Sequence, residues 1–134
     1  MASTSLQPSR RALLAVVDPV MRRVCREALD SAGFAVANAI ESGAAAMTAA
    51  REEHPEIILL SQQLSDVPAL EAVKWLRSNA ESAATPIIIL GGNAAANAAR
   101  DRITVLPRSI TAAQLRYALV EALGNRATTK QVSP

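Results

Sequence analysis

Few residues of this chain could carry out chemistry, and they lie far apart in the sequence. His54 is the only histidine and Cys25 the only cysteine among 134 residues. A Ser-His-Asp arrangement needs its histidine beside the serine, but an apolar run of strand length separates His54 from Ser61. A single cysteine can form neither an intramolecular disulfide nor a cysteine metal cluster, and Cys25 falls on an apolar helical stripe. The sequence therefore argues against an enzyme.

Other polar residues could bind an ion. Asp18, alone or with Asp66, offers the carboxylate oxygens that Mg²⁺ prefers. Asp18-Pro19 is more typical of a simple turn after a strand, which is the interpretation we favour. A small anion could be held by glycine amides, polar side chains and one guanidinium, contributed by Ser61, Gln62, Gly91, Gly92 and Arg108. The alternative interpretation is a collapsed pocket that the side chains of Val16 and Val17 fill.

The elements that would position these residues follow from apolar periodicity. Apolar runs predict five strands at residues 12–17, 34–40, 56–60, 87–90 and 103–106. Helical spacing predicts helices at 21–32, 42–53, 68–79, 93–102 and 111–123, the fourth being short. Alternating strands and helices predict an α/β fold, a flavodoxin-like (βα)5 doubly wound parallel sheet with strand order 2-1-3-4-5. The polar residues above then fall at the carboxyl ends of the strands.

The chain is long enough for one domain, which we expect to span residues 11–124. Thr111 is expected to cap the last helix and Gly124 to lie beyond its end. Residues 1–10 and the polar tail at 125–134 are expected to be flexible.

Three segments resemble one family in their order and spacing. They are LLAVVDPVMRR at residues 13–23, PEIILLSQQLSDVPALEAVKWLR at 55–77 and ITVLPRSIT at 103–111. Together they are similar to the receiver domain of response regulators: a first strand with its acidic turn, a strand that ends at the phosphorylated aspartate, and a strand that ends at a lysine. The resemblance covers nearly the whole chain and implies the CheY-like version of the fold.

The resemblance fails at the residues that carry the family's chemistry. Aligned on Pro19, the two metal-binding carboxylates of receivers correspond to Val16 and Val17, and a one-residue deletion would instead put Asp18 at the second position. The acceptor aspartate corresponds to Ser61, the hydroxyl residue after strand 4 to Gly91, and the lysine to Arg108. Valine cannot ligate a hard cation, and serine does not attack a phosphoryl donor without a base. The resemblance thus implies a pseudo-receiver that needs no metal or other cofactor.

Protein contact is the function that this pattern favours, in bacterial two-component-like signalling and independently of phosphorylation. The partner would be a histidine kinase, a response regulator or a similar protein. One candidate surface is Arg22 and Arg23 on the first helix, beside Val20 and a methionine, Met21, that we expect to be exposed. Another is Arg116, Tyr117 and Val120 on the last helix, where a homodimer could form through helix 4, strand 5 and helix 5. The alternative function is a sensor for a small anion or ligand at Ser61, Gly91 and Arg108.

Composition weighs against other classes. The net charge is only +2, and no basic stripe with interleaved aromatic residues is visible, so we expect no nucleic-acid binding. The residues after Leu123 are too few for a helix-turn-helix. No apolar run approaches the roughly 18 residues of a membrane span, and no signal peptide is visible. These features predict no membrane contact and a cytoplasmic protein.

Overall fold

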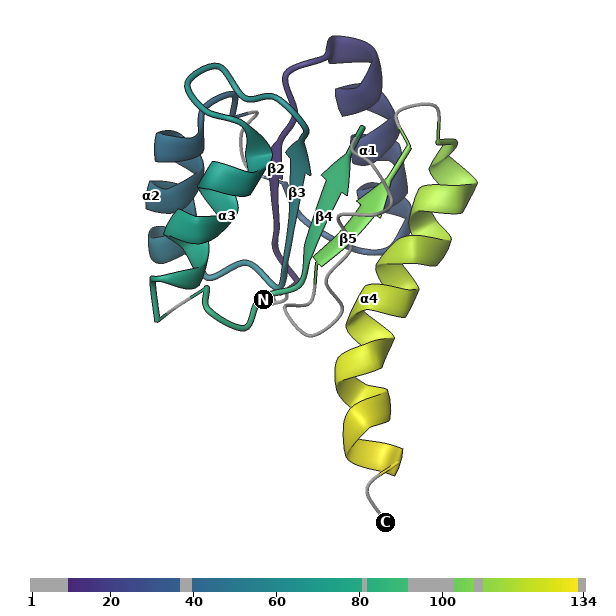
Figure 1. Ribbon diagram of the computed structural model, residues 1–134. Helices are drawn as coiled ribbons and strands as arrows, with labels where there is room; N and C mark the ends of the chain where they lie inside the picture. The colour runs from purple at the N-terminus through teal and green to yellow at the C-terminus, as the bar shows by residue number, and fades with distance from the viewer. Residues whose placement is uncertain (1–9, 37–39, 81, 92–102, 108–109, 133–134) are drawn as a thin grey trace, which may run out of the picture.

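Four parallel strands form the centre of the protein in a computed structural model (Figure 1). The structure describes residues 10–36, 40–80, 82–91, 103–107 and 110–132, and only the backbone of residues 124–132. The strands are β2 (Ala12–Ala15), β3 (Ile57–Ser61), β4 (Ile87–Leu90) and β5 (Ile103–Leu106). They lie in the order β2-β3-β4-β5, each parallel to its neighbour. This order matches the 1-3-4-5 part of the predicted sheet.

The predicted strand at 34–40 is only partly formed in the described residues. Ala35 makes an isolated parallel bridge with Arg11, and the Ile40 amide donates to the Leu14 carbonyl at 3.2 Å. The Ala35 amide also donates to the Arg10 carbonyl. Between this hydrogen bond and the one from Ile40, the edge segment advances five residues, from 35 to 40, whereas its partner strand advances four, from 10 to 14. One extra residue interrupts a regular ladder. The segment therefore flanks β2 as the order 2-1 requires, without continuous pairing.

Helices cover both faces of the sheet (Figure 1). The helices α1 (Pro19–Ser31) and α4 (Ala112–Val132) lie on one face, and α2 (Gly43–Glu53) and α3 (Ala69–Arg77) lie on the other. This confirms the doubly wound α/β fold. The helix predicted at 93–102 lies outside the described residues, so α4 corresponds to the helix predicted last.

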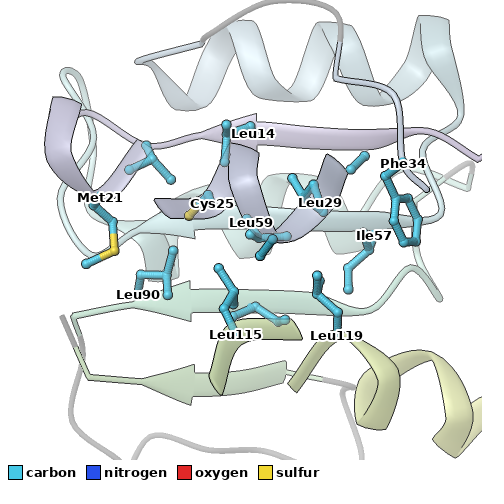
Figure 2. Close-up of a cluster of buried hydrophobic side chains, with 14 of the residues drawn as sticks. Leu14, Met21, Cys25, Leu29, Phe34, Ile57, Leu59, Leu90, Leu115 and Leu119 are labelled. Atoms are coloured by element: carbon cyan, nitrogen blue, oxygen red, sulfur yellow. The ribbon is translucent and has the colours of Figure 1, made fainter. Parts of the chain in front are cut away.

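Each face of the sheet has its own apolar core, as continuous apolar runs in parallel strands predict. Figure 2 shows the core under α1 and α4, where Leu14 and Leu59 of the sheet meet Leu29 of α1 and Leu115 of α4. The opposite face packs Leu13, Ile58, Ile87 and Val105 against α2 and α3. Cys25 belongs to the first core, as its place on the apolar stripe predicts, and burial raises the pKa of its thiol to about 12.

The predicted end of the last helix at Gly124 is wrong. The helix begins as expected: the Thr111 hydroxyl accepts from the Gln114 amide at 3.2 Å, and the Gln114 side chain accepts from the Thr111 amide at 3.0 Å. It then continues through Gly124 to Val132. Glycine inside a helix costs only about 1 kcal/mol relative to alanine, so a single glycine between helix-forming residues does not have to end the helix.

A stability prediction follows from His54, which ends α2 in the left-handed conformation at φ 51°. Glycine adopts this conformation without the steric cost that a Cβ imposes. We expect His54→Gly to raise the free energy of unfolding by about 0.5 kcal/mol, while His54→Val lowers it. Urea unfolding of the two variants checks this, and a loss of stability in His54→Gly would contradict it.

In the part of the chain that the structure describes, no helix is both long and apolar enough to span a membrane. The cytoplasmic location stays a prediction.

Candidate functional site at the carboxyl edge of the sheet

The carboxyl ends of β2, β3 and β4 meet at one edge, where the register sets Ala15 beside Leu60 and Ser61 beside Leu90. A hollow of about 220 Å³ opens there. Its lining comes from the segments that follow these strands and from the first turn of α1: Val17, Asp18, Met21, Ser61, Gln62, Gln63 and Leu90. Four residues of the predicted site, Val16, Val17, Asp18 and Ser61, therefore come together at this edge.

Ser61, at the expected place of the phosphorylated aspartate, has a hydroxyl that is engaged on both sides. Its oxygen accepts a hydrogen bond from the Val17 amide at 3.3 Å. Its proton goes to the Gln63 carbonyl at 3.1 Å. The serine thus ties the end of β2 to the loop after β3, and neither partner is a base that could activate it.

Arg22 closes the same edge from α1. Its guanidinium donates to the Val16 carbonyl at 3.0 Å and to the Val17 carbonyl at 3.1 Å. It also pairs with the Glu41 carboxylate at 3.1 Å, with 23% of the arginine side chain exposed. The guanidinium has several N–H donors that point in different directions, so it can bind both carbonyls and the carboxylate at once. Arg22 therefore joins the end of β2 to the segment that precedes α2.

The two valines at this edge differ in their surroundings. Val16 is fully buried in the core under α1 and α4. Val17 is half-buried and lines the hollow. Of the two valines that the ungapped resemblance aligns with metal-binding carboxylates, Val17 therefore lines the hollow and Val16 does not.

Asp18 is the N-cap of α1, as its carboxylate accepts from the Val20 amide at 3.0 Å and Pro19 occupies the first turn. Asp18-Pro19 therefore has a local structural role, as the turn interpretation expected, but it starts a helix and does not form a simple turn. No group of three or more metal-ligating side chains occurs among the described residues. The described lining of the hollow holds one carboxylate, Asp18, and it is engaged in capping α1, so these side chains do not fit Mg²⁺, which proteins bind through carboxylates and water.

Asp66 also caps a helix, α2, which begins 23 residues earlier in the chain. Its carboxylate accepts from the Gly43 amide at 2.7 Å and from the Ala44 amide at 3.2 Å, at the start of α2. The Gly43 amide, first among several backbone donors, lowers the pKa of Asp66. Beside it, the Ser65 amide donates to the Glu41 carbonyl at 2.8 Å. The loop after β3 is therefore anchored on the amino-terminal end of α2.

This cap gives a pH-dependent prediction. Because the pKa of Asp66 is lower in the folded protein than its ordinary value of 3.8, the carboxylate stabilises the fold above that value and loses this effect as the pH falls through the folded pKa. We expect Asp66→Asn to be less stable than the parent protein at pH 7, with the difference shrinking as the pH approaches 3. Urea unfolding across this range tests it, and a difference that grows on acidification would contradict it.

Gly91 turns the chain directly after β4, at φ 99°, a conformation that disfavours any residue with a Cβ. Its amide donates to the Leu106 carbonyl at 2.7 Å, so it also ties β4 to the end of β5. This backbone role explains a glycine at the position that corresponds to a hydroxyl residue. Gly92 and Arg108 of the predicted anion pocket lie outside the described residues.

The candidate surface on α1 is smaller than we expected. Met21 is buried in the core, so the prediction of an exposed methionine is wrong. It precedes Cys25 by four residues and so lies on the buried stripe of α1, while Val20 points outward with 69% exposed. Arg23 is exposed, but Arg22 is turned inward onto the backbone of the β2 end.

The candidate surface on α4 lies on the side away from the core. Tyr117 is 68% and Val120 63% exposed, and Arg116 is exposed beside them. Leu115 and Leu119 on the other side are fully buried. Sequence analysis therefore separated the two sides of this helix correctly.

Sequence analysis missed Glu41, which pairs with Arg22 and whose carbonyl holds the loop after β3. No spacing rule joins residues so far apart in the chain. The sequence also does not reveal that Asp66 caps α2. Ser42 accepts from the Ala45 amide at 3.0 Å and marks the helix start. The other free amides of that first turn can take a second acceptor, which is the place that Asp66 fills.

Comparison with known proteins gives one family match, to the response regulator receiver domain, over residues 14–106. The chain is 35% identical over 66 residues to the polar-differentiation response regulator DivK of Brucella ovis, and 32% identical over 66 residues to the protein of that name from Brucella anthropi. Each alignment covers 49% of this chain and 53% of the relative. The chain thus spans about half the length of the curated relatives it matches.

Solved receiver structures share the fold. The receiver domain of the sensor histidine kinase PA1611 from Pseudomonas aeruginosa, described with a magnesium ion coordinated in its active site cleft, has a TM-score of 0.73 at 23% identity, over 87% of this chain and 99% of that one. The chemotaxis response regulator CheY4 of Vibrio cholerae has a TM-score of 0.72 at 21% identity, over 86% of this chain and 100% of that one. At these identities the likeness supports the fold alone.

Proposed function

Because the chain belongs to the response regulator receiver domain family, we propose that it is a pseudo-receiver, which acts in bacterial two-component signalling without being phosphorylated. Receiver domains are signalling modules of two-component systems, and we propose that this one works through contact with another protein and not as an enzyme. The observation that carries the proposal is Ser61, a serine engaged in two backbone hydrogen bonds at the position of the phosphorylated aspartate.

Phosphoryl transfer to an aspartate uses a carboxylate nucleophile and a cation that neutralises the developing charge. Ser61 supplies a hydroxyl, whose proton is committed to the Gln63 carbonyl. The sole histidine, His54, ends α2 before β3 begins, whereas Ser61 lies at the opposite end of that strand. Neither hydrogen-bond partner of the hydroxyl is a base, and the usual reaction has no carboxylate nucleophile at this position.

The cation is the second missing component. The Pseudomonas aeruginosa receiver is described with a coordinated magnesium ion, whereas here the Arg22 guanidinium binds the carbonyls at the end of β2. A permanent positive charge at this point disfavours a divalent cation nearby. Arg22 would thus stabilise the β2 end as part of the protein, with no metal required.

A fixed conformation follows from the same contacts. Arg22 and Glu41 join α1 to the start of α2, and Asp66 joins the loop after β3 to that same start. Ser61 links this loop back to β2. We infer that a ring of contacts of this kind favours a surface that is always presented in one form.

The partner we propose is another signalling protein, a histidine kinase, a response regulator or a similar chain. Candidate contacts are Arg23 with the exposed Val20 on α1, and Arg116 with Tyr117 and Val120 on α4. The hollow gives less support to the alternative of an anion sensor. Asp18 is the charged side chain among its lining residues, and a carboxylate repels an anion.

The test is incubation of the protein with acetyl phosphate and Mg²⁺, followed by intact-mass measurement under neutral and acidic conditions. A receiver that retains its aspartate serves as the positive control, and Ser61→Ala as the matched variant. We expect no added phosphoryl group on this chain. A phosphoryl adduct that disappears in Ser61→Ala would overturn the proposal.

A further inference from the structure

The hollow at the carboxyl edge combines apolar surface with a single charged side chain. Val17, Met21 and Leu90 supply the apolar part of its lining, and Asp18 supplies the charge. The Oδ1 atom of Asp18 accepts from the Val20 amide at 3.0 Å, whereas no hydrogen bond joins Oδ2 to another described residue. One carboxylate oxygen at the hollow is therefore open to a donor from outside the chain.

The charges near the hollow leave the Asp18 carboxylate dominant. The Arg22 guanidinium is paired with Glu41 and is not among the described lining residues. The amino-terminal end of α1 carries the equivalent of about half a positive charge, which offsets only part of the full negative charge of Asp18. A divalent ion would need several oxygen ligands, but an organic ammonium group needs only one acceptor at a time. The hollow therefore suits an organic cation.

Size and geometry select a lysine side chain as this cation. The hollow measures about 220 Å³, less than the roughly 300–1,000 Å³ of pockets that hold a drug-sized molecule. A guanidinium donates as a fork and is matched best by a carboxylate with both oxygens free. Because Oδ1 of Asp18 is engaged in the helix cap, an ammonium group fits better, and its methylene stem can cover Met21 and Leu90.

Exposed apolar side chains flank the hollow from two helices. Val20, which is 69% exposed, lies two residues after Asp18 in α1. Leu70, which is 55% exposed, follows Ala69, whose amide donates to the Gln62 carbonyl at 2.8 Å. Figure 1 shows α1 and α3 beginning at this edge on opposite faces of the sheet. A free amine would leave both apolar side chains uncovered, whereas a protein segment that carries the lysine can cover them.

We propose that the hollow receives a lysine side chain of the partner protein, with its ammonium group on Asp18 and neighbouring apolar residues of the partner on Val20 and Leu70. This inference rests on the proposed function, because a hollow that held a magnesium ion and a phosphoryl group would be closed to a lysine. It gives the partner a defined chemistry, an exposed lysine flanked by apolar side chains.

Titrations followed in ¹H–¹⁵N correlation spectra test this assignment. The probes are acetyl-Leu-Lys-Leu-amide, the same peptide with norleucine in place of lysine, and n-butylamine as a free amine. We expect the lysine peptide to shift the amide signals of Asp18 and Gln62 saturably and to bind about fivefold tighter than either other probe. Asp18→Asn keeps an N-cap residue but removes the charge, so it should abolish the difference between the two peptides.

Two exposed positions elsewhere supply the controls. Asp30→Asn, at the far end of α1, should leave the preference for lysine intact. Leu70→Ser should weaken binding of the lysine peptide without changing that of n-butylamine, whereas Val120→Ser on α4 should change neither.

Three results would overturn the lysine assignment: no saturable shift with the lysine peptide, equal binding of the norleucine peptide, or an unchanged preference in Asp18→Asn. Equal binding of n-butylamine and the lysine peptide would overturn the assignment to a protein partner. Failure of the titrations would leave the intact-mass result with acetyl phosphate unaffected, so the inference and the proposed function can fail separately.

Discussion

Val16→Asp is expected to lower the free energy of unfolding by about 3–5 kcal/mol, because an unpaired carboxyl group then enters the apolar core under α1. Val16 is completely buried, and its neighbours in that core include Leu14, Met21 and Leu90. In the ungapped alignment on Pro19, the same substitution would introduce an acid at one of the two acidic positions of the receiver family. The packing of the core around Val16 therefore disfavours a metal-binding carboxylate at this position.

The neighbouring position supplies the control. Val17 is half-buried at the hollow, so a carboxylate there can stay hydrated, and we expect Val17→Asp to cost about 1 kcal/mol or less. Urea unfolding of both variants at pH 7 gives the comparison. Equal losses at the two positions would mean that Val16 does not occupy the core as described.

The second large effect concerns Arg22. We expect Arg22→Met to lower the free energy of unfolding by about 2 kcal/mol, because two backbone carbonyls at the end of β2 and the Glu41 carboxylate lose a charged donor. Methionine keeps most of the apolar stem, so the loss reports the guanidinium. Faster amide hydrogen exchange of Val17 is expected as well, because its amide is bound to the Ser61 hydroxyl and this contact would no longer be supported by Arg22 on the Val16 and Val17 carbonyls.

Arg23→Met is the matched control for this prediction. Arg23 follows directly in α1 and is exposed, so its loss should change stability by no more than about 0.5 kcal/mol. Equal unfolding midpoints for the two methionine variants would contradict the role assigned to Arg22.

Local patterns predicted most of the fold. The buried run before Ser61, the helix start at residue 42 and the Thr111 cap each depend on a few neighbouring residues, and the structure has them where expected. The edge segment and the end of α4 departed from prediction. Whether an extra residue interrupts the pairing beside β2, and whether the helix continues through Gly124, depends on energy differences of about 1 kcal/mol. Apolar periodicity does not reveal differences of this size.

The candidate site was predicted less completely. The family resemblance located Val16, Val17 and Ser61 at one edge, and the structure brings them together. It did not reveal that Arg22 turns inward, because its partner Glu41 is 19 residues away and the pairing depends on how α1 and α2 meet across the sheet. The position of Asp66 at the start of α2 depends on tertiary structure in the same way.

The central claim is that this edge keeps one conformation and accepts no phosphoryl group. Its most direct test is a ¹H–¹⁵N correlation spectrum recorded during titration with Mg²⁺ and beryllofluoride, a mimic of the aspartyl phosphate. We predict that the amide signals of Val17, Ser61 and Gly91 do not move. Saturable shifts of these signals would show that the edge still binds the phosphoryl mimic, and would contradict the account.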